Sequence, residues 1–346
     1  MNSIGIYVPR RLTQYDKSDR LFARELFRVI KKSGRYQPLR LNLPRLSIAS
    51  SEKAGEFCRR NNLVLILEHD SSLYSSEIFY PLRERYKKNV MLLEKCVPFI
   101  NSIQAQKNGY SKITTKNILK KCGLPVLEDT IVNSVRELEN SIQEGKWYVI
   151  KPPDNGAGTG VKLIKKERAE YFAYNNGEWR TVKITEVKLK SGAIGLVVKY
   201  QVDRRSPLLA LKKIYLDFNY SPMLIEPYFN DDKEGFASLR CTVIGDEVVE
   251  AVKRTNKKNI TSNISSGGTA EKIELSAEQK KIAVEAKNAI GADYAGVDFL
   301  VSGGETVIGE INIGPFTVYS KTTGVNVGKV MAEYLMNKCD TLAKNS

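Results

Sequence analysis

Apolar positions in the first third of the chain alternate between short strand-like runs and one helical stretch. Ile4–Val8 and Leu63–Leu67 are short apolar runs, and Val90–Leu93 is a further candidate strand. Leu21–Lys32 has the spacing of an amphipathic helix, which is expected to end at Gly34. Short apolar runs of this kind are typical of buried parallel strands. The pattern predicts an α/β layout with a parallel sheet, and no glycine-rich dinucleotide fingerprint follows its first strand.

The middle of the chain is predicted to begin with two short helices. The first, at about Thr115–Cys122, should stop at Gly123, because glycine followed by Pro125 is a common helix terminator. The second has a capping box at Ser134–Glu137 and should end near Gly145. A strand, a glycine-rich loop and a returning strand are then predicted, at Trp147–Lys151, Asp154–Gly160 and Val161–Ile164.

The remaining half is predicted to be rich in strands. Residues 165–222 are basic and aromatic, and their pattern is harder to assign. Beyond them, one hairpin turns at Gly245-Asp246, a helix is capped at Ser276 and ends at Gly291, and a second hairpin follows. The expected strands are Val182–Leu189, Gly195–Val202, Met223–Glu226, the hairpin pair Leu239–Ile244 and Val248–Arg254, and the hairpin pair Val297–Val301 and Thr306–Asn312.

Length and charge narrow the class of protein. A chain of 346 residues is long enough for two or three domains with a sizeable core. Its formal net charge is +15, of which +10 lies in residues 1–110 and +6 in residues 165–222, so the rest is close to neutral. A basic surplus fits a nucleic-acid binder. Because the surplus is confined to two regions, we interpret it as attraction for an anionic substrate, with nucleic acid as a minor alternative.

Other features exclude further classes. No run approaches the ~20 apolar residues of a membrane span, and the N-terminus lacks a signal-peptide core. The five cysteines are far apart and include no CxxC pair, which favours reduced thiols in a cytoplasmic protein. His69 is the single histidine, so His-rich metal sites are excluded. It follows a buried strand, and a structural role is favoured over substrate contact.

The loop Asp154–Gly160 carries the first candidate chemistry. Its alternate glycines, Gly156, Gly158 and Gly160, let backbone N–H groups approach phosphate oxygens closely. Lys151 ends the preceding strand and would add a positive charge for nucleotide phosphates. The spacing differs from that of a P-loop and no helix follows directly, so a Walker site is excluded. Taken alone, the loop has the alternative interpretation of an ordinary glycine-rich hairpin.

The second candidate site is the last hairpin, where two carboxylates and an amide could hold a metal ion. Glu310 and Asn312 are two residues apart, so they share one face of a strand. A three-residue turn at Ser302–Gly304 would place Asp298 opposite Ile308. Asp298 would then lie diagonal to Glu310, completing a hard oxygen-ligand set for Mg²⁺ with nucleotide phosphates. A two-residue turn would place Asp298 on the other face and leave a solvated acidic pair.

A series of short segments runs in a fixed order from the middle of the chain towards its end. They are Lys112 ahead of a short helix, Gly123-Leu-Pro125, Lys151 with its glycine loop, Leu224-Ile-Glu226-Pro-Tyr228, Leu239-Arg240, Val252-Lys-Arg254, Asn263 with Gly267-Gly268, Val297-Asp298 and Glu310-Ile-Asn312 with Pro315. In this order they resemble the ATP-grasp superfamily, over about residues 105–330. The chain looks most like the branch of ribosomal-protein glutamate ligase, lysine-biosynthesis ligase and glutathione synthetase.

The resemblance implies a fold and a set of domains. The fold is α/β, an ATP-grasp fold with an α+β lid and an N-terminal Rossmann-like domain. The implied domains are residues 1–105 ahead of the ATP-grasp fold, residues 106–225 for the central and lid part with its basic insert at 165–222, and residues 226–340 for the C-terminal part with the metal site. The implied cofactors are ATP and Mg²⁺, as two ions, with Mn²⁺ as an alternative metal.

The resemblance also implies a role for each matching residue. ATP phosphates would be held by Lys112, Lys151 and the glycine loop, and adenine and ribose by Glu226, Tyr228 and the adjacent backbone. Mg²⁺ would be ligated by Asp298, Glu310 and Asn312. Arg240 and Arg254 would face the transferred phosphoryl group, with Asn263 lining the same site. Singly, each residue also has an ordinary interpretation as an exposed or turn residue.

The reaction implied by the resemblance is amide formation through an acyl phosphate, with release of ADP and phosphate. The expected partners are an anionic small-molecule or peptide carboxylate and an amine, and the chain could form a homodimer or a larger homo-oligomer. Substrate contacts are expected from the N-terminal domain, with Arg10 and Arg11 as candidates, from the insert at 165–222 and from loops near Thr317–Thr323. The alternatives are a phosphotransferase acting on an anionic small molecule, a ligase that modifies a peptide or protein, and a non-catalytic binder of acidic partners or nucleic acid.

Two features of the first hairpin depart from the family pattern. Ser238 stands two residues before Arg240, where an acidic residue is common. A two-residue turn at Gly245-Asp246 would also place Arg240 and Arg254 on opposite faces of the sheet. Both arginines can reach one site only if the hairpin contains a bulge or a longer turn.

Overall fold

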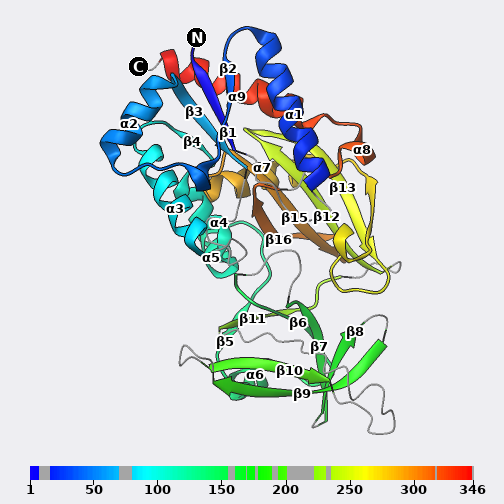
Figure 1. Ribbon diagram of the computed structural model, residues 1–346. Helices are drawn as coiled ribbons and strands as arrows, with labels where there is room; N and C mark the ends of the chain where they lie inside the picture. The colour runs from blue at the N-terminus through cyan, green and yellow to red at the C-terminus, as the bar shows by residue number, and fades with distance from the viewer. Residues whose placement is uncertain are drawn as a thin grey trace.

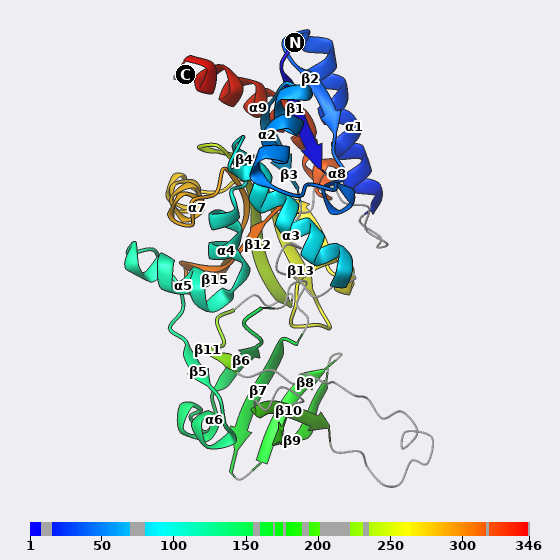
Figure 2. The same ribbon diagram turned by 60° about the vertical axis from the view of Figure 1, so that its left-hand side comes forward.

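Three sheets are arranged in two bodies, a larger one that holds both ends of the chain and a smaller one built from its middle (Figures 1 and 2). The computed structural model describes residues 1–7, 16–69, 80–154, 160–168, 170–175, 178–188, 194–200, 222–230, 235–315 and 318–344. Several predicted features lie outside these residues, namely Gly156, Gly158, Arg10, Arg11, Thr317 and residues 201–221 of the basic insert.

The N-terminal sheet is parallel, as the sequence predicts, and its strand order is β2-β1-β3-β4. The strands are β1 (Ser3–Tyr7), β2 (Gln37–Arg40), β3 (Leu63–Glu68) and β4 (Phe99–Ile100). The helices of this region are α1 (Asp16–Ser33), α2 (Ser51–Arg60) and α3 (Tyr80–Glu94), with a short 3₁₀ helix at Leu43–Arg45. In the first third of the chain, the alternation of strand-like and helical apolar runs was therefore sufficient to predict an α/β layout with a parallel sheet.

Val90–Leu93 lies inside α3, so the prediction of a strand there is wrong. Tyr86, Val90 and Leu93 are all buried in one cluster. Their spacing of four and then three residues places them on one face of a helix. A four-residue apolar run fits either a strand or a helix, and the wider spacing decides for the helix.

The smaller body is one antiparallel sheet with the order β10-β9-β8-β7-β6-β11-β5. Its elements are β5 (Thr130–Val132), α6 (Val135–Ser141), β6 (Trp147–Lys151), β7 (Lys162–Glu167), β8 (Glu170–Asn175), β9 (Glu178–Lys188), β10 (Ile194–Tyr200) and β11 (Met223–Pro227). Ser134 caps α6 as predicted, accepting from the Glu137 N–H at 3.1 Å. The Glu137 carboxylate instead accepts from Asn133 N–H at 2.7 Å, and the helix ends at Ser141, short of Gly145.

The C-terminal sheet is antiparallel, with the order β14-β13-β12-β15-β16. Its strands are β12 (Phe236–Ile244), β13 (Glu247–Asn256), β14 (Thr269–Lys272), β15 (Tyr294–Ser302) and β16 (Glu305–Ile313). A 3₁₀ helix at Ile264–Ser266 and α7 (Ala277–Ala289) connect strands, and α8 (Ser320–Thr323) and α9 (Val327–Lys344) follow β16. One face is apolar and contributes Cys241, Val297 and Phe299 to a core shared with Ala283 and Ala286 of α7. The predicted capping box at Ser276 forms in full.

Two helices before the smaller body pack with the C-terminal sheet. Ala105 of α4 (Ile103–Tyr110) and Leu119 of α5 (Lys112–Lys121) belong to the same core as Ile311 of β16. By packing, these helices belong with the C-terminal sheet, whereas the sequence had assigned them largely to the central and lid part. β11 conversely lies in the smaller body, up to Pro227. The chain therefore enters the smaller body after α5 and leaves it after β11.

Asn101 joins the N-terminal and C-terminal sheets. It follows β4, and its side chain is buried against the start of β15. Its amide donates to Tyr294 O at 2.6 Å, and its Oδ1 accepts from the N–H groups of Asp293 at 2.7 Å and Tyr294 at 3.0 Å. Buried backbone groups need such partners. One side chain thus satisfies three backbone groups at the boundary between two sheets.

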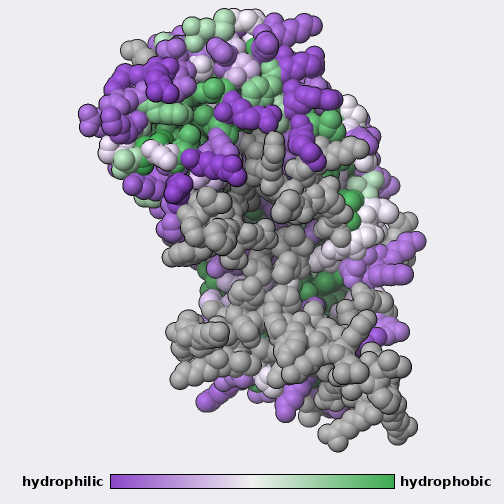
Figure 3. Space-filling view, viewed as in Figure 1, coloured by the Kyte–Doolittle hydropathy of each residue, from purple (hydrophilic) through white to green (hydrophobic). Residues whose placement is uncertain are grey.

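Hydrophilic side chains line both upper edges of the larger body, where α1 and α2 lie (Figure 3). The exposed basic residues of α1 are Arg20, Arg24, Arg28, Lys31 and Lys32. Much of the N-terminal positive charge is thus solvated rather than buried. Among the described helices, none has the length and apolar character needed to cross a bilayer.

We predict that Asn101→Ala lowers the free energy of unfolding by about 2–3 kcal/mol, because it leaves buried backbone groups without partners. Urea denaturation followed by circular dichroism would measure the change. Asn337→Ala, at an exposed position of α9, is the matched control and should stay within about 0.5 kcal/mol of the parent chain. Equal stability of the two variants would show that Asn101 does not hold the sheets together.

Candidate active site

The polar face of the C-terminal sheet lines a cleft between the two bodies. Cross-strand partners in a sheet share a face, and so do residues two apart along a strand. The strand register therefore places a row of polar side chains and one glycine together, namely Ser238, Arg240, Thr242, Glu250, Arg254, Gly296, Asp298, Glu310 and Asn312.

A β-bulge in the first hairpin puts both arginines on this face. The turn has two residues, as expected, with Ile244 opposite Glu247. The register then shifts between Thr242 and Val243, which leaves Val249 as the extra residue. After the shift Arg240 lies opposite Val252 and Arg254 lies opposite Ser238. Both arginines could reach one site only through a bulge or a longer turn, and the bulge is present.

A second bulge corrects the register of the last hairpin. Of the two turn lengths considered, the two-residue turn is present, because Ser302 pairs with Glu305 across Gly303 and Gly304. With no bulge this turn would send Asp298 to the other face. The register shifts between Asp298 and Phe299 and leaves Gly309 as the extra residue. Asp298 is therefore directly opposite Glu310, and the expected set of side chains does share one face, for a different reason.

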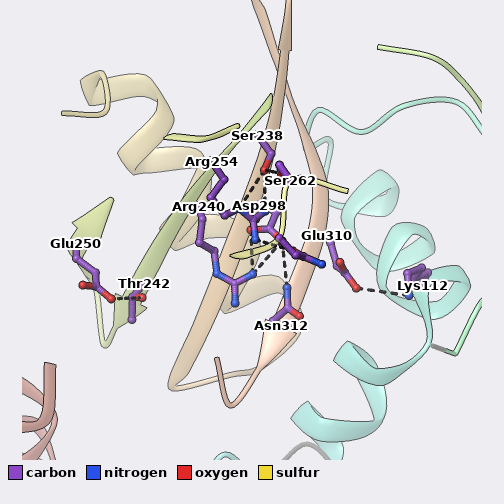
Figure 4. Close-up of polar contacts among 11 residues, drawn as sticks. Lys112, Ser238, Arg240, Thr242, Glu250, Arg254, Ser262, Asp298, Glu310 and Asn312 are labelled. Carbon is purple, nitrogen blue, oxygen red and sulfur yellow. Dashed lines mark hydrogen bonds and ion pairs between the residues drawn. The ribbon is translucent and has the colours of Figure 1, made fainter. Parts of the chain in front are cut away.

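Asp298 lies between the two arginines (Figure 4). Arg240 Nη1 is 2.9 Å from each carboxylate oxygen, and Arg254 Nη2 is 3.0 Å from Oδ1. Asn312 donates its amide to Oδ2 at 3.3 Å. Burial opposes ionisation of Asp298, but Arg240 and Arg254 outweigh it and hold its pKa below the usual value. The carboxylate is thus kept charged in a buried position.

Ser238 is a site residue whose role the sequence did not reveal. Its Oγ accepts from Arg254 Nε at 3.1 Å and Nη2 at 2.7 Å, and it lies 2.5 Å from Ser262 Oγ. Asn263 Oδ1 accepts from Arg254 Nη1 at 3.1 Å. The Ser238 hydroxyl and the Asn263 amide oxygen therefore fix the guanidinium of Arg254, and Ser238 stands where the family often has an acidic residue. The departure at Ser238 was visible in the sequence, but its contact with Arg254 depended on the bulge.

Gly296 lies beneath the guanidinium of Arg240. A Cβ at this position would be 2.6 Å from Arg240 Cζ, far inside van der Waals contact. The absence of a side chain therefore lets Arg240 lie flat over β15 and reach Asp298 with one nitrogen. Close packing against Arg240 therefore explains why a glycine stands at position 296.

Two lysines approach the cleft from other elements. Lys112, the first residue of α5, has its Nζ 3.4 Å from Glu310 Oε1 (Figure 4). Lys151, at the end of β6, has its Nζ 2.7 Å from Glu226 Oε2 on β11. These four residues line the cleft together with Tyr228, Arg254, Asn263 and Asp298. Gly160 is described and has a φ of +83°, a conformation that glycine adopts at little cost, while Val161 beside it lines the cleft.

The donor set fits Mg²⁺. Within the described residues, no group of three or more His, Cys, Asp and Glu side chains could hold a metal ion, so a metal site here would need the Asn312 amide as well as Asp298 and Glu310. Carboxylate and amide oxygens are the ligands that Mg²⁺ prefers, together with waters and substrate phosphates. Asp298 would then link the metal to both arginines.

Glu250 extends the polar face beyond Arg240 (Figure 4). It is buried and accepts hydrogen bonds from Thr242 Oγ1 at 3.1 Å and from Thr323 Oγ1 of α8 at 2.9 Å. Burial raises the pKa of its carboxyl above the usual value, although both hydroxyls and Arg240 act in the opposite direction. No motif in the sequence singled out this residue.

We predict a pH-dependent effect of Glu250→Gln on stability. A carboxyl with a raised pKa in the folded chain keeps its proton after the unfolded chain has lost its own, so stability falls as the pH rises through that interval. Glutamine does not titrate. Glu250→Gln should therefore become more stable relative to the parent chain as the pH rises from about 4 towards neutrality, which lies above the usual glutamate pKa.

Urea denaturation at a series of pH values would measure this difference. Glu333→Gln, at an exposed position of α9, is the control and should show little change across the series. A difference for Glu250→Gln that shrinks as the pH rises would contradict the assignment of a raised pKa.

Sequence comparisons identify relatives among the alpha-L-glutamate ligases. Residues 183–335 match a family described as the RimK-like ATP-grasp domain. A probable alpha-L-glutamate ligase of Haemophilus influenzae is 38% identical over 239 residues, covering 68% of this chain and 66% of that protein. The tetrahydromethanopterin:alpha-L-glutamate ligase of Methanocaldococcus jannaschii is 27% identical over 245 residues, covering 70% of this chain and 72% of that protein. Matches to other probable alpha-L-glutamate ligases span about half of those relatives.

Solved structures support the fold across the whole chain. The ATP-grasp ligase PsnB, in complex with a minimal precursor, has a TM-score of 0.60 at 16% identity, with 97% of this chain and 99% of that chain covered. D-alanine--D-alanine ligase from Bacillus anthracis has a TM-score of 0.55 at 15% identity, with 100% and 99% covered. At such identities the likeness concerns the fold alone. Together with the motifs in order, the glutamate ligase relatives and the RimK-like domain, it shows that the chain belongs to the ATP-grasp superfamily of carboxylate–amine ligases.

Proposed function

We propose that this protein uses ATP to join a carboxylate of an amino-acid or peptide substrate to the amino group of an amino acid. L-Glutamate is the first candidate for the amine, because several relatives are named as alpha-L-glutamate ligases. The observation that carries the proposal is the convergence of Lys112, Lys151, Arg254, Asp298 and Glu310 on one cleft. Cations and carboxylates in this combination suit phosphoryl transfer with a metal ion.

The proposed reaction has two steps. A substrate carboxylate oxygen bonds to the γ-phosphorus of ATP as the bond to the ADP oxygen breaks, giving an acyl phosphate. The amine then bonds to the acyl carbon and the phosphate leaves, while the amine loses its proton to solvent or phosphate. Bound Mg²⁺ would neutralise phosphate charge, held by Asp298, Glu310 and Asn312. The proposal includes two ions, with Mn²⁺ able to replace them.

In this proposal the chain itself supplies positioning and positive charge. Lys112 and Lys151 would bind phosphate oxygens, and Tyr228 with the backbone after β11 would contact the adenine. Arg254, fixed by Ser238 and Asn263, would stabilise charge on the transferred phosphoryl group. Arg240 would act from behind Asp298, which it holds in place. Donors that are fixed in advance need no reorganisation during the reaction.

An ADP-release screen would test the proposed function. Amino-acid, peptide and phosphate-bearing compounds would be supplied with ATP and Mg²⁺, and the products would be analysed by mass spectrometry. We expect an amide product together with ADP and phosphate. Lys151→Ala should abolish ADP release, whereas Lys146→Ala, at an exposed position just before β6, should not. A phosphorylated product without an amide would indicate a kinase instead, and persistent turnover by Lys151→Ala would refute the nucleotide site.

We also predict that Gly296→Ala lowers kcat by about 100-fold, because its Cβ would displace the guanidinium of Arg240 from Asp298. Gly55→Ala in α2 is the control, since its Cβ would meet only the flexible end of Arg59 at 3.3 Å. Steady-state ADP release and circular dichroism would be measured for both variants. Full activity of a folded Gly296→Ala protein would show that the position of Arg240 is unimportant.

A further inference from the structure

Lys116 is a buried lysine that no sequence motif singled out. It lies one helical turn after Lys112 on α5, and it is 5% exposed. Its Nζ is 2.5 Å from Glu226 Oε1, 3.0 Å from Leu127 O and 3.7 Å from Asp129 Oδ1. Burial lowers the pKa of Lys116, and Glu226 opposes that effect. A lysine is rarely buried to this degree unless it is paired.

Glu226 is shared by two lysines. Lys116 contacts one carboxylate oxygen, and Lys151 contacts the other at 2.7 Å. Glu226 and Lys151 are 3% and 8% exposed. Burial opposes ionisation of Glu226, but Lys151 and Lys116 outweigh it and hold its pKa below the usual value. The three side chains therefore form a buried group with a net charge of +1.

Lys116 changes the net charge of the group from which Lys151 would bind an anionic ligand. A pair of Lys151 and Glu226 alone would be neutral, and the carboxylate would oppose an anionic ligand that approached Lys151. Coulomb interactions are strong in a partly buried site, where the effective dielectric is low. With Lys116 on the other oxygen, the group keeps one positive charge for a phosphate. Lys151 and Glu226 line the main cleft, whereas Lys116 lines a smaller hollow behind it, next to Gly309 and Glu310.

Lys116 also comes from a different body of the molecule. It belongs to α5, which packs with the C-terminal sheet, while Glu226 and Lys151 lie on adjacent strands of the smaller body. The pair Lys116–Glu226 thus joins the two bodies. The chain passes between the bodies near β11, which carries Glu226 (Figure 1). The ion pair fixes the strand that positions Lys151.

We propose that Lys116 is a positioning residue for ATP binding, which neutralises Glu226 so that Lys151 can bind a phosphate. The proposal rests on the proposed function, because it concerns the same nucleotide site. Glu226 in this account holds the lysines, and it need not contact the ribose, which was the role implied by the family resemblance. The proposal makes a specific prediction about charge. Removing Lys116 alone leaves the group neutral, whereas removing both Lys116 and Glu226 restores a net charge of +1, carried by Lys151.

The test is a double-mutant cycle with Lys116→Met, Glu226→Gln and the combined variant. ATP affinity would be measured directly by isothermal titration calorimetry with Mg²⁺, and KM for ATP and kcat by ADP release. Lys116→Met should weaken ATP binding by about 10-fold, equivalent to about 1.4 kcal/mol, with a smaller effect on kcat at saturating ATP. The combined variant should recover ATP affinity to within about threefold of the parent chain.

Lys121→Met is the matched control. Lys121 is exposed at the end of the same helix, α5. It should leave ATP affinity unchanged. If Lys116→Met proves unstable, the ATP affinity of the combined variant still tests the proposal. The combined variant has no charge at either substituted position, so neither position holds an unpaired buried charge.

The outcomes separate this proposal from the proposed function. A parent chain that does not bind ATP would refute both. If the parent chain binds ATP and Lys116→Met binds it equally well, only the role of Lys116 is refuted. Additive losses in the combined variant, with no recovery of affinity, would likewise show that Lys116 and Glu226 act separately and would overturn the proposal.

Discussion

Two β-bulges, one in each hairpin of the C-terminal sheet, decide which side chains face the cleft. Side chains alternate between the faces of a strand, so a shift of one residue exchanges the polar and apolar faces. Val249 and Gly309 are the extra residues, and each returns its strand to the register that the site needs. Without them, Arg254 or Asp298 would point into the core formed with α7. The arrangement of the site depends on these two local irregularities.

The two sides of the cleft repeat one electrostatic arrangement. On the sheet side Asp298 lies between Arg240 and Arg254, and on the side of the smaller body Glu226 lies between Lys116 and Lys151. Each group has one buried carboxylate shared by two cations, and each carries a net charge of +1. Buried charges are costly unless they are paired. Sharing one carboxylate stabilises two buried cations while leaving positive charge for an anionic ligand between the bodies.

The sequence was sufficient for the layer type, most strand positions and the main members of the site. Lys112, Lys151, Asp298 and Glu310 could be found because motifs in a fixed order reflect a shared chemistry. The register could not be predicted, since turn length and bulges depend on packing across strands. The role of Ser238 and the presence of Lys116 in the site were missed for a related reason. Each acts through a partner that is distant in sequence, and nothing in the local pattern distinguishes a buried lysine on α5 from an exposed one.

The central claim is that the polar face of the C-terminal sheet transfers a phosphoryl group to a carboxylate. The most direct measurement uses a substrate that supports ADP release, with ¹⁸O in its carboxylate, and mass spectrometry of the released phosphate. If an acyl phosphate forms, one ¹⁸O atom must pass from the carboxylate to each phosphate released with the amide. Phosphate without the label, with the ¹⁸O lost from the carboxylate found in water or in a nucleotide instead, would contradict the account.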